Sequence, residues 1–426
     1  MTTGGTRDRT TDRTRDRTSR DSGYIRDRSR TVFGVGSTIG ILGGGQLGRM
    51  MAVEARKMGY RTVVLDPSSR CPTAQVSDGF VVGALDDVAS ATHLARQVDV
   101  ITLDTEHVPA EVLDEITKIA PVRPGADVLR TIQDRLVQKQ FLDRIGMPQA
   151  AWAQVDGPAD LDAALAKVGR PAILKVRRAG YDGKGQMRVD PGADAPALLA
   201  RLRPKSPANP RLDDGFTPTT GNEPCVVEEV VSFVREISVV LARSVTGQTA
   251  IYPIAENVHR KHILHTTRAP APVTPELAAA ATRIACDVAT ALDHVGVMAV
   301  EMFELADGRL LVNEIAPRTH NSGHYTYGAC STSQFEQHVR AICGLPLGDP
   351  RSMSGAVMVN LTGDLWSAGP PAWEHVLARP EARLHLYGKD GPAPGRKMGH
   401  VLLLDDDTDR ALATAEALID VLSPRS

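Results

Sequence analysis

The chain has 426 residues, which is too long for one compact core, so we expect two or three domains. Hydrophobic residues make up 42% of the chain and the formal net charge is −2, a balance that argues against nucleic acid or anionic membrane binding through bulk charge. The five cysteines are scattered and form no CxxC pair, so neither a zinc site nor a disulfide framework is expected and a reducing cytoplasm fits. No apolar run reaches membrane-spanning length.

The N-terminal segment differs in composition from the rest. Residues 6–30 repeat Arg, Asp and Thr with almost nothing to bury, so we expect a disordered tail over residues 1–35. Organelle transit peptides are poor in acidic residues, whereas this tail alternates Arg with Asp. We interpret it as a dispensable extension.

The first ordered segment predicts a strand, a glycine-rich loop, a helix and a second strand. The strand covers residues 38–42, the loop 43–48, the helix 49–57 and the second strand 61–66, ending in Asp66. This order is typical of dinucleotide-binding folds, although glycine-rich first turns occur in many open α/β sheets. The free amides at the helix start make an anion site in either case.

Further elements follow in order along the chain. Residues 98–103 predict a strand followed by acidic residues, 126–145 a helix, and 172–175 a strand that ends in Lys175. The basic, glycine-rich stretch 177–186 predicts either a lid over a triphosphate or a solvent-exposed loop, and it lacks the GK[ST] ending of a Walker A motif. Residues 204–224 predict a surface loop, 225–240 two strands separated by a bend, 275–292 an amphipathic helix, and 407–422 a closing helix.

Two apolar runs around Asp307-Gly308 predict a β-hairpin with a two-residue turn. That turn sets three opposed pairs: Leu305 with Leu310, Phe303 with Val312, and Glu301 with Glu314. Because opposed like charges repel, a cation between the two glutamates is indicated, and Mg²⁺ bridging a nucleotide phosphate suits oxygen ligands. The alternative is one solvated carboxylate and an error in the register. Strand alternation places Asn313 on the opposite face from Glu314.

The loop after the hairpin carries Arg318, His320, Asn321 and His324 beside the two glutamates. Such a group of basic and amide side chains predicts a substrate pocket, and the alternative is a structural loop capped by Asn and His. An arginine fork suits bidentate binding of a carboxylate-like anion. A histidine that titrates near neutrality can donate a hydrogen bond or accept a proton.

With these segments in order, the chain resembles the ATP-grasp enzymes, and among them the 5-(carboxyamino)imidazole ribonucleotide synthase family of purine biosynthesis. The motifs that carry the resemblance are residues 43–48, Lys175 with 180–186, 313–324 and 394–400. It covers residues 38–422. It implies a mixed α/β and α+β fold with a Rossmann-like pre-ATP-grasp domain at 36–134, a two-lobed ATP-grasp domain at 135–345 with a lid at about 172–230, and a small β-rich C-terminal domain at 346–426.

The resemblance also implies an activity. ATP and bicarbonate would form carboxyphosphate, which carboxylates aminoimidazole ribonucleotide with release of ADP and phosphate. The implied cofactor is Mg²⁺, and the implied protein is a cytoplasmic homodimer that binds neither nucleic acid nor membrane. Rival hypotheses are a formate-using glycinamide ribonucleotide transformylase, an NAD-dependent oxidoreductase and a non-catalytic paralogue.

The residues implied by the resemblance fall into four groups. ATP would be bound by Arg135, Lys175, Gly180, Tyr181, Asp182, Gly183, Lys184, Gly185, Gln186, Glu228, Glu229, Val230, Val231, Glu236, His259, Asn313 and Glu314. Metal would be held by Glu301 and Glu314. Substrate would be bound by Gln46, Leu47, Asp104, Glu106, Asn321, Arg396 and Lys397, and catalysis would use Tyr181, Arg318, His320 and Lys397. The family often has Glu-x-Glu where this chain has Asp104-Thr-Glu106, which leaves open which acid contacts the aminoimidazole.

Overall fold

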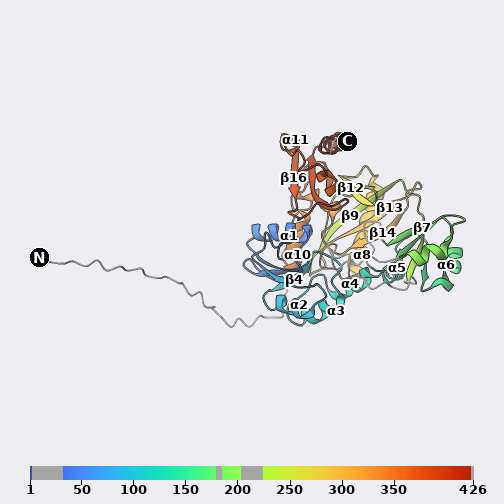
Figure 1. The fold of residues 1–426 in the computed structure, drawn as a ribbon, viewed down its shortest axis with the longest axis horizontal. Coiled ribbons are helices and arrows are strands. Elements are labelled where there is room, and N and C mark those ends of the chain that lie inside the picture. The colour runs from blue at the N-terminus through green and yellow to red at the C-terminus, as the bar shows by residue number, and fades with distance from the viewer. Residues whose placement is uncertain (2–31, 179–184, 203–223, 424–426) are drawn as a thin grey trace.

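The computed structural model describes residues 1, 32–178, 185–202 and 224–423. Residues 2–31 of the expected N-terminal tail, residues 179–184 of the predicted lid and most of the predicted 204–224 loop lie outside the described residues. The predicted tail extends too far, because Phe33 is buried and its amide donates to the Cys343 carbonyl at 2.8 Å. Figure 1 shows three β-sheets arranged side by side with helices around them. The mixed α/β and α+β architecture predicted from the sequence is confirmed.

The N-terminal sheet is parallel, with strand order β3-β2-β1-β4. Its strands are β1 (Thr38–Leu42), β2 (Arg61–Asp66), β3 (Gly79–Val82) and β4 (Val100–Leu103). Its helices are α1 (Gln46–Lys57), α2 (Val88–Ala95), α3 (Ala110–Thr117) and α4 (Ala126–Gln133). Every residue of β1 is buried, as expected for a strand covered on both faces. Helix α1 starts at Gln46, inside the glycine-rich segment and three residues earlier than predicted.

The predicted helix over residues 126–145 is wrong, because Asp134 divides it into two. Asp134 is extended between α4 and α5 (Arg135–Arg144), and its carboxylate accepts the Leu136 amide at the start of α5. The same carboxylate accepts two hydrogen bonds from Arg177, at 2.7 and 2.9 Å. The ion pair and the helix cap together stabilise the break.

A second, antiparallel sheet has strand order β5-β8-β6-β7. It contains β5 (Trp152–Val155), β6 (Ala172–Val176), β7 (Gln186–Val189) and β8 (Cys225–Glu229), with the 3₁₀ turn η1 (Pro158–Asp160) and helices α6 (Leu161–Val168) and α7 (Ala195–Arg201). The helices and strands share an apolar core of their own. This lobe lies to the right in Figure 1.

The third sheet has nine strands and joins the predicted ATP-grasp and C-terminal regions. Its order is β14-β13-β9-β11-β12-β15-β17-β16, with β10 paired to β9. The strands are β9 (Arg235–Arg243), β10 (Thr249–Ile251), β11 (Ala255–Arg260), β12 (Ile263–Ala269), β13 (Gly296–Glu304), β14 (Leu310–Ala316), β15 (Ala356–Thr362), β16 (Ala382–Leu386) and β17 (Lys397–Leu404). Because β12 pairs with β15, the C-terminal strands extend the same sheet.

The remaining helices cover this sheet and connect it to the first one. They are α8 (Pro275–Ala291), η2 (Asn321–Gly323), α9 (Thr326–Ala329), α10 (Gln334–Ile342), η3 (Gly363–Trp366), α11 (Glu374–Leu377) and α12 (Thr408–Leu422). Helix α8 buries its apolar face against β9 and β13, and α10 packs against both α1 and β13. Helix α10 therefore joins the N-terminal domain to the large sheet.

The hairpin that carries Glu301 and Glu314 forms, but its loop and register differ from those predicted. Leu305 donates its amide to Arg309 at 2.9 Å, so the connection is a three-residue loop with Gly308 at φ +79°, a known hairpin geometry. The predicted two-residue turn is wrong. The pairs next to the loop shift by one residue and become Glu304 with Leu310, Phe303 with Leu311, and Met302 with Val312.

A bulge at Asn313 then restores the register. Met302 pairs with Val312 and Glu301 with Glu314, so Asn313 is the extra residue. The predicted pairing of Glu301 with Glu314 is confirmed because the loop and the bulge shift the register in opposite directions. The bulge also breaks strand alternation, and Asn313 and Glu314 line the same cavity. The prediction that they face opposite sides is wrong.

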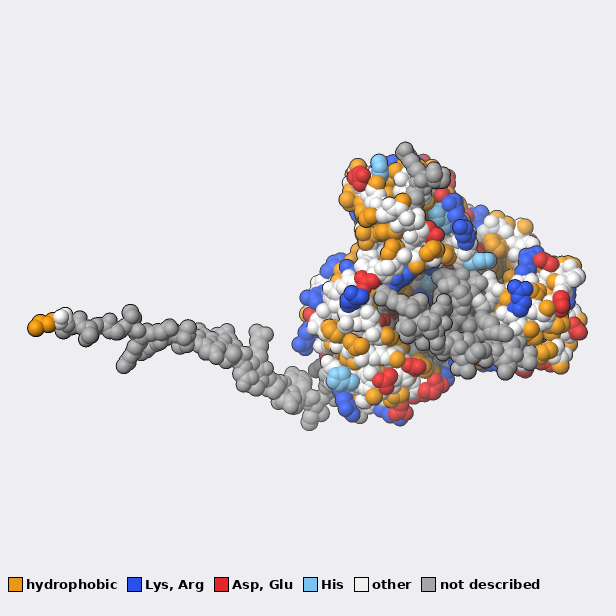
Figure 2. Space-filling model, in the orientation of Figure 1, with side chains coloured by type: hydrophobic (Ala, Val, Ile, Leu, Met, Phe, Trp, Pro, Cys, Tyr) orange, Lys and Arg blue, Asp and Glu red, His pale blue; other side chains and the backbone are white. Residues whose placement is uncertain are grey.

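The distribution of charged side chains on the surface agrees with the near-neutral net charge of the sequence. On the face shown in Figure 2, basic, acidic and apolar side chains are interspersed. Within the described part of the chain, no helix combines the length and apolar character needed to cross a membrane.

Candidate active site

A cavity of about 1200 Å³ lies where the first and third sheets meet. It is lined by seventeen side chains predicted from the sequence: Gln46, Leu47, Asp104, Glu106, Arg135, Lys175, Gln186, Glu236, His259, Glu301, Asn313, Glu314, Arg318, His320, Asn321, Arg396 and Lys397. Gly185, Glu228, Glu229, Val230 and Val231 do not line it, and Gly180, Tyr181, Asp182, Gly183 and Lys184 lie outside the described residues. The tertiary structure therefore brings most of the predicted site together.

The sequence analysis missed several lining residues. His107 follows Glu106 directly, His262 lies at positive φ between β11 and β12, and Lys389 precedes the predicted 394–400 motif. His107 was the easiest to find, because it extends an acidic segment already assigned to the site. No local sequence pattern identifies His262 or Lys389 as a site residue.

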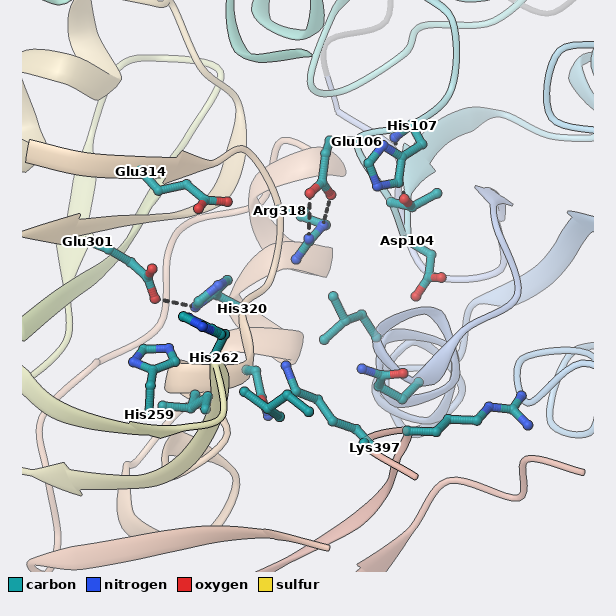
Figure 3. A pocket seen from close by; sticks show the side chains of 18 of the residues that line it. Asp104, Glu106, His107, His259, His262, Glu301, Glu314, Arg318, His320 and Lys397 are labelled. Atoms are coloured by element: carbon teal, nitrogen blue, oxygen red, sulfur yellow. Dashed lines mark hydrogen bonds and ion pairs between the residues drawn. The ribbon is translucent and has the colours of Figure 1, made fainter. Parts of the chain in front are cut away.

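The glutamate pair occupies one wall of the cavity (Figure 3). Burial and the neighbouring Glu314 carboxylate raise the pKa of Glu301 to about 7. The two apposed carboxylates repel each other, and His259 and Lys397 offset this only in part. Asn313 lines the same cavity and brings an amide oxygen as a third donor of this kind. This all-oxygen set fits Mg²⁺, which commonly takes one or two protein carboxylates and completes its shell with water and phosphate.

Arg318 and Glu106 form a partly buried ion pair at the cavity wall (Figure 3). Arg318 Nη2 donates to Glu106 Oε1 at 2.9 Å and Nε donates to Oε2. Burial opposes ionisation of Glu106, yet Arg318 lowers its pKa to about 2. The third bond of Arg318 runs from Nη1 to the Thr319 carbonyl at 3.1 Å. A guanidinium has five N–H donors, and its bonds to described residues use three of them, which leaves two for an anion.

Asp104 holds the glycine-rich loop against the end of β4. Its carboxylate accepts the amides of Gly45 at 2.7 Å and Gly48 at 2.5 Å. Burial raises the pKa of Asp104, while these two amides oppose the rise. Asp66 accepts the Gly44 amide at 2.8 Å, so the acid that ends the second strand of the predicted dinucleotide-binding unit binds the glycine-rich loop.

Two histidines differ in their electrostatic setting. His259 pairs with Glu236 through Nδ1; burial opposes its charge, but Glu236 raises its pKa above the ordinary value. His320 lies near Arg318 and Lys397, and burial together with these cations lowers its pKa to about 3. His320 is therefore neutral at physiological pH.

Glu228 lies beneath the cavity and binds two lysines. Its Oε2 is 2.9 Å from Lys175 Nζ and 3.2 Å from Lys139 Nζ. Burial opposes ionisation, but these lysines lower the pKa of Glu228 to about 2. Glu229 accepts the Ala151 amide at 2.9 Å. Lys139 was not predicted as a site residue.

Three family models match consecutive parts of the chain. They are the ribonucleotide synthetase preATP-grasp domain at residues 36–133, the ATP-grasp domain at 140–335 and the phosphoribosylaminoimidazole carboxylase C-terminal domain at 356–414. The N5-carboxyaminoimidazole ribonucleotide synthase of Brucella melitensis is 46% identical over 366 residues, which cover 86% of this chain and 96% of that protein. The chain belongs to the N5-carboxyaminoimidazole ribonucleotide synthase family.

Other members of the N5-carboxyaminoimidazole ribonucleotide synthase family agree. The Bacillus subtilis enzyme is 38% identical over 89% of this chain and 95% of its own length. The Staphylococcus aureus synthetase complexed with ADP has a TM-score of 0.83 at 34% identity, covering 91% of this chain and 98% of that one. The Aspergillus clavatus enzyme in complex with ADP and 5-aminoimidazole ribonucleotide has a TM-score of 0.81 at 33% identity, with coverage of 91% and 98%.

The family assignment decides between the enzyme hypotheses. The chain is an ATP-grasp ligase of purine biosynthesis that forms N5-carboxyaminoimidazole ribonucleotide. The oxidoreductase, transformylase and non-catalytic hypotheses do not agree with this assignment. The roles of individual residues stay predictions.

Proposed function

We propose that this protein uses ATP, bicarbonate and Mg²⁺ to carboxylate aminoimidazole ribonucleotide. It acts as a homodimer in the cytoplasm, and its domains cover residues 36–134, 135–345 and 346–426. The supporting observation is one cavity that joins an oxygen-rich carboxylate wall to Arg318 and His320 and to basic residues of β17. The five free cysteines fit a reducing compartment. The homodimer follows from the family resemblance.

The ATP side of the cavity is proposed to comprise Arg135, Lys175, Gln186, Glu236 and His259. Lys175 and Arg135 supply positive charge for phosphates, and the ion pair of Glu236 with His259 fixes two polar groups for the nucleoside. Phosphoryl transfer depends on positioning and neutralisation of charge, which this arrangement supports. The proposed ATP contacts of residues 180–184 in the lid and of residues 228–231 stay predictions.

The proposed metal ligands are Glu301 and Glu314, with Asn313 as an additional oxygen donor. Bound there, Mg²⁺ would neutralise charge on the transferring phosphoryl group. All three oxygen donors lie on one hairpin. Because of the bulge at Asn313, the neighbouring side chains of Asn313 and Glu314 line the same cavity.

The proposed carboxyl-transfer centre is Arg318 and His320, with Asn321 and Tyr181 nearby. A bicarbonate oxygen attacks the γ-phosphorus and ADP leaves, giving carboxyphosphate. The amine nitrogen of the ribonucleotide then attacks the carboxyl carbon, phosphate leaves, and the amine loses a proton. The two remaining N–H donors of Arg318 suit the carboxylate of bicarbonate or carboxyphosphate, and His320 donates a hydrogen bond or accepts the amine's proton.

The ribonucleotide is proposed to lie between the first sheet and β17. Gln46 and Leu47 lie at the start of α1, where amides favour a phosphate, and Arg396 and Lys397 line the same cavity from the C-terminal strands. Asp104 binds the loop amides through its carboxylate and Glu106 binds Arg318, so either acid reaches the aminoimidazole only with its remaining oxygen lone pairs.

The test is release of ADP and phosphate with ATP, bicarbonate and aminoimidazole ribonucleotide, each omitted in turn. Product formation requires all three, and the carboxylated ribonucleotide should appear in step with phosphate. The control replaces bicarbonate and the ribonucleotide by formate and glycinamide ribonucleotide. Equal turnover with that pair would overturn the proposal.

A further inference from the structure

A row of buried polar side chains runs across the large sheet to His320. Thr267 on β12, Asn257 on β11 and Ser238 on β9 lie on three neighbouring strands, and Ser322 lies in η2. Each of these four residues is at most 4% exposed. Buried polar side chains are costly unless every bond is made, so their connection to the site needs a physical explanation.

The bonds of the row are continuous. Thr267 Oγ1 is 2.9 Å from Asn257 Oδ1, and Asn257 Nδ2 is 3.0 Å from Ser238 Oγ. Ser238 Oγ is 2.8 Å from Ser322 Oγ, which is 2.9 Å from His320 Nδ1. The row therefore ends on one ring nitrogen of His320, a residue that lines the cavity.

One fixed donor reveals the direction of the hydrogen bonds in the whole row. The backbone amide of Ser322 points at His320 Nδ1 at 3.3 Å, and an amide can only donate. Nδ1 is therefore an acceptor without a proton, and the Ser322 hydroxyl must also donate to it. That hydroxyl oxygen then accepts from Ser238.

The same reasoning extends to the far end of the row. Ser238 donates to Ser322 and so accepts from the Asn257 amide group, which leaves Asn257 Oδ1 to accept from Thr267. Every hydroxyl and amide points toward His320. Glu301 Oε1 lies 3.8 Å from Nδ1, beyond hydrogen-bond range, so it does not compete.

We propose that Ser322, Ser238, Asn257 and Thr267 are positioning residues that hold His320 as the Nε2–H tautomer. With Nδ1 occupied, the proton of a neutral ring sits on Nε2, and that N–H is the ring's polar group for the cavity. This inference rests on the proposed function in one respect: the Nε2–H donates to an oxygen of bicarbonate or carboxyphosphate. It removes the alternative that His320 accepts the amine's proton.

The first test is spectroscopic and needs no substrate. In full-length protein labelled with ¹⁵N-histidine at neutral pH, a long-range ¹⁵N–¹H correlation spectrum distinguishes the two neutral tautomers and the charged ring. The His320 signals are assigned by their loss in His320→Gln. We expect a neutral ring with its proton on Nε2. A proton on Nδ1, or a charged ring, would overturn the proposal.

The second test removes one bond of the row and compares a matched serine. Ser238→Ala deprives the Ser322 hydroxyl of its donor but keeps the Ser322 amide, so part of the His320 population should move to the Nδ1–H tautomer, whose proton then bonds the Ser322 hydroxyl. We expect kcat to fall about tenfold, with little change in the KM for ATP. Ser244→Ala is the control, because Ser244 is also buried, directly follows β9 and, among the described residues, bonds only within its own turn. It should leave His320 and kcat unchanged.

The two tests separate this inference from the proposed function. Wild-type His320 signals in Ser238→Ala would overturn the positioning role even if kcat fell, because the fall would then reflect general destabilisation. If the signals change as expected but no carboxylated ribonucleotide forms in the wild-type protein, the proposed function fails while the tautomer assignment stands.

Discussion

Removing either partner of the Glu106–Arg318 ion pair should lower the free energy of unfolding. The two side chains are 17–19% exposed, so each variant leaves a mostly buried charge without its counterion. Such a loss typically costs about 3–5 kcal/mol of unfolding free energy. We expect this for Arg318→Met and for Glu106→Gln, although in the latter the neutral amide still accepts one bond.

The double variant distinguishes a coupled pair from two separate contacts. Because Glu106→Gln with Arg318→Met removes both charges of the pair, its cost should fall short of the sum of the single variants by about 2–3 kcal/mol. Urea unfolding midpoints at pH 7, converted with a common m value, measure this difference. Glu115→Gln is the control: Glu115 pairs with Lys118 on the surface, and its loss should cost less than about 0.5 kcal/mol. Additive costs in the double variant would refute the reasoning.

Three further predictions concern the rest of the site and the interdomain contacts. Glu301→Gln and Glu314→Gln should each abolish most turnover, with strongly non-additive losses, and wild-type turnover in either variant would contradict the metal assignment. Either variant should also raise the melting temperature without metal, since burial and the apposed Glu314 raise the pKa of Glu301 to about 7. Lys397→Ala should raise the KM for the ribonucleotide while that for ATP stays near normal; equal changes would indicate misfolding instead. Burial lowers the pKa of His338 to about 3, below its unfolded value of about 6.5. Between about pH 6.5 and 3 the unfolded chain therefore binds more protons than the folded chain, so the free energy of unfolding decreases by up to about 1.4 kcal/mol for each pH unit that the pH falls. His338→Gln should flatten this slope in urea midpoints measured at pH 7, 6 and 5, and an unchanged slope would refute it.

Local sequence patterns determined the elements and the chemical character of the site. The apolar run at β1, the glycine-rich loop and the Asp307-Gly308 turn signal depend on residues close in the chain, so they could be predicted without the fold. The pairing of Glu301 with Glu314 was also predicted, yet the predicted turn was wrong. Turn geometry and a bulge at Asn313 both depend on how the hairpin packs, and local preference does not specify them.

Only the tertiary structure decided which distant groups meet. Glu106 and Arg318 are 212 residues apart in the sequence, and Thr102 bonds His338 across 236 residues at 2.7 Å. No local periodicity records such contacts, because they arise when the packing of α10 and the large sheet against the first domain brings these side chains together. The sequence by itself therefore determined which residue types the site contains. The fold decided that Arg318 is already paired, that Asp104 binds the glycine-rich loop, and that His320 receives its hydrogen bonds from a buried row, since burial makes each of these polar groups find a partner.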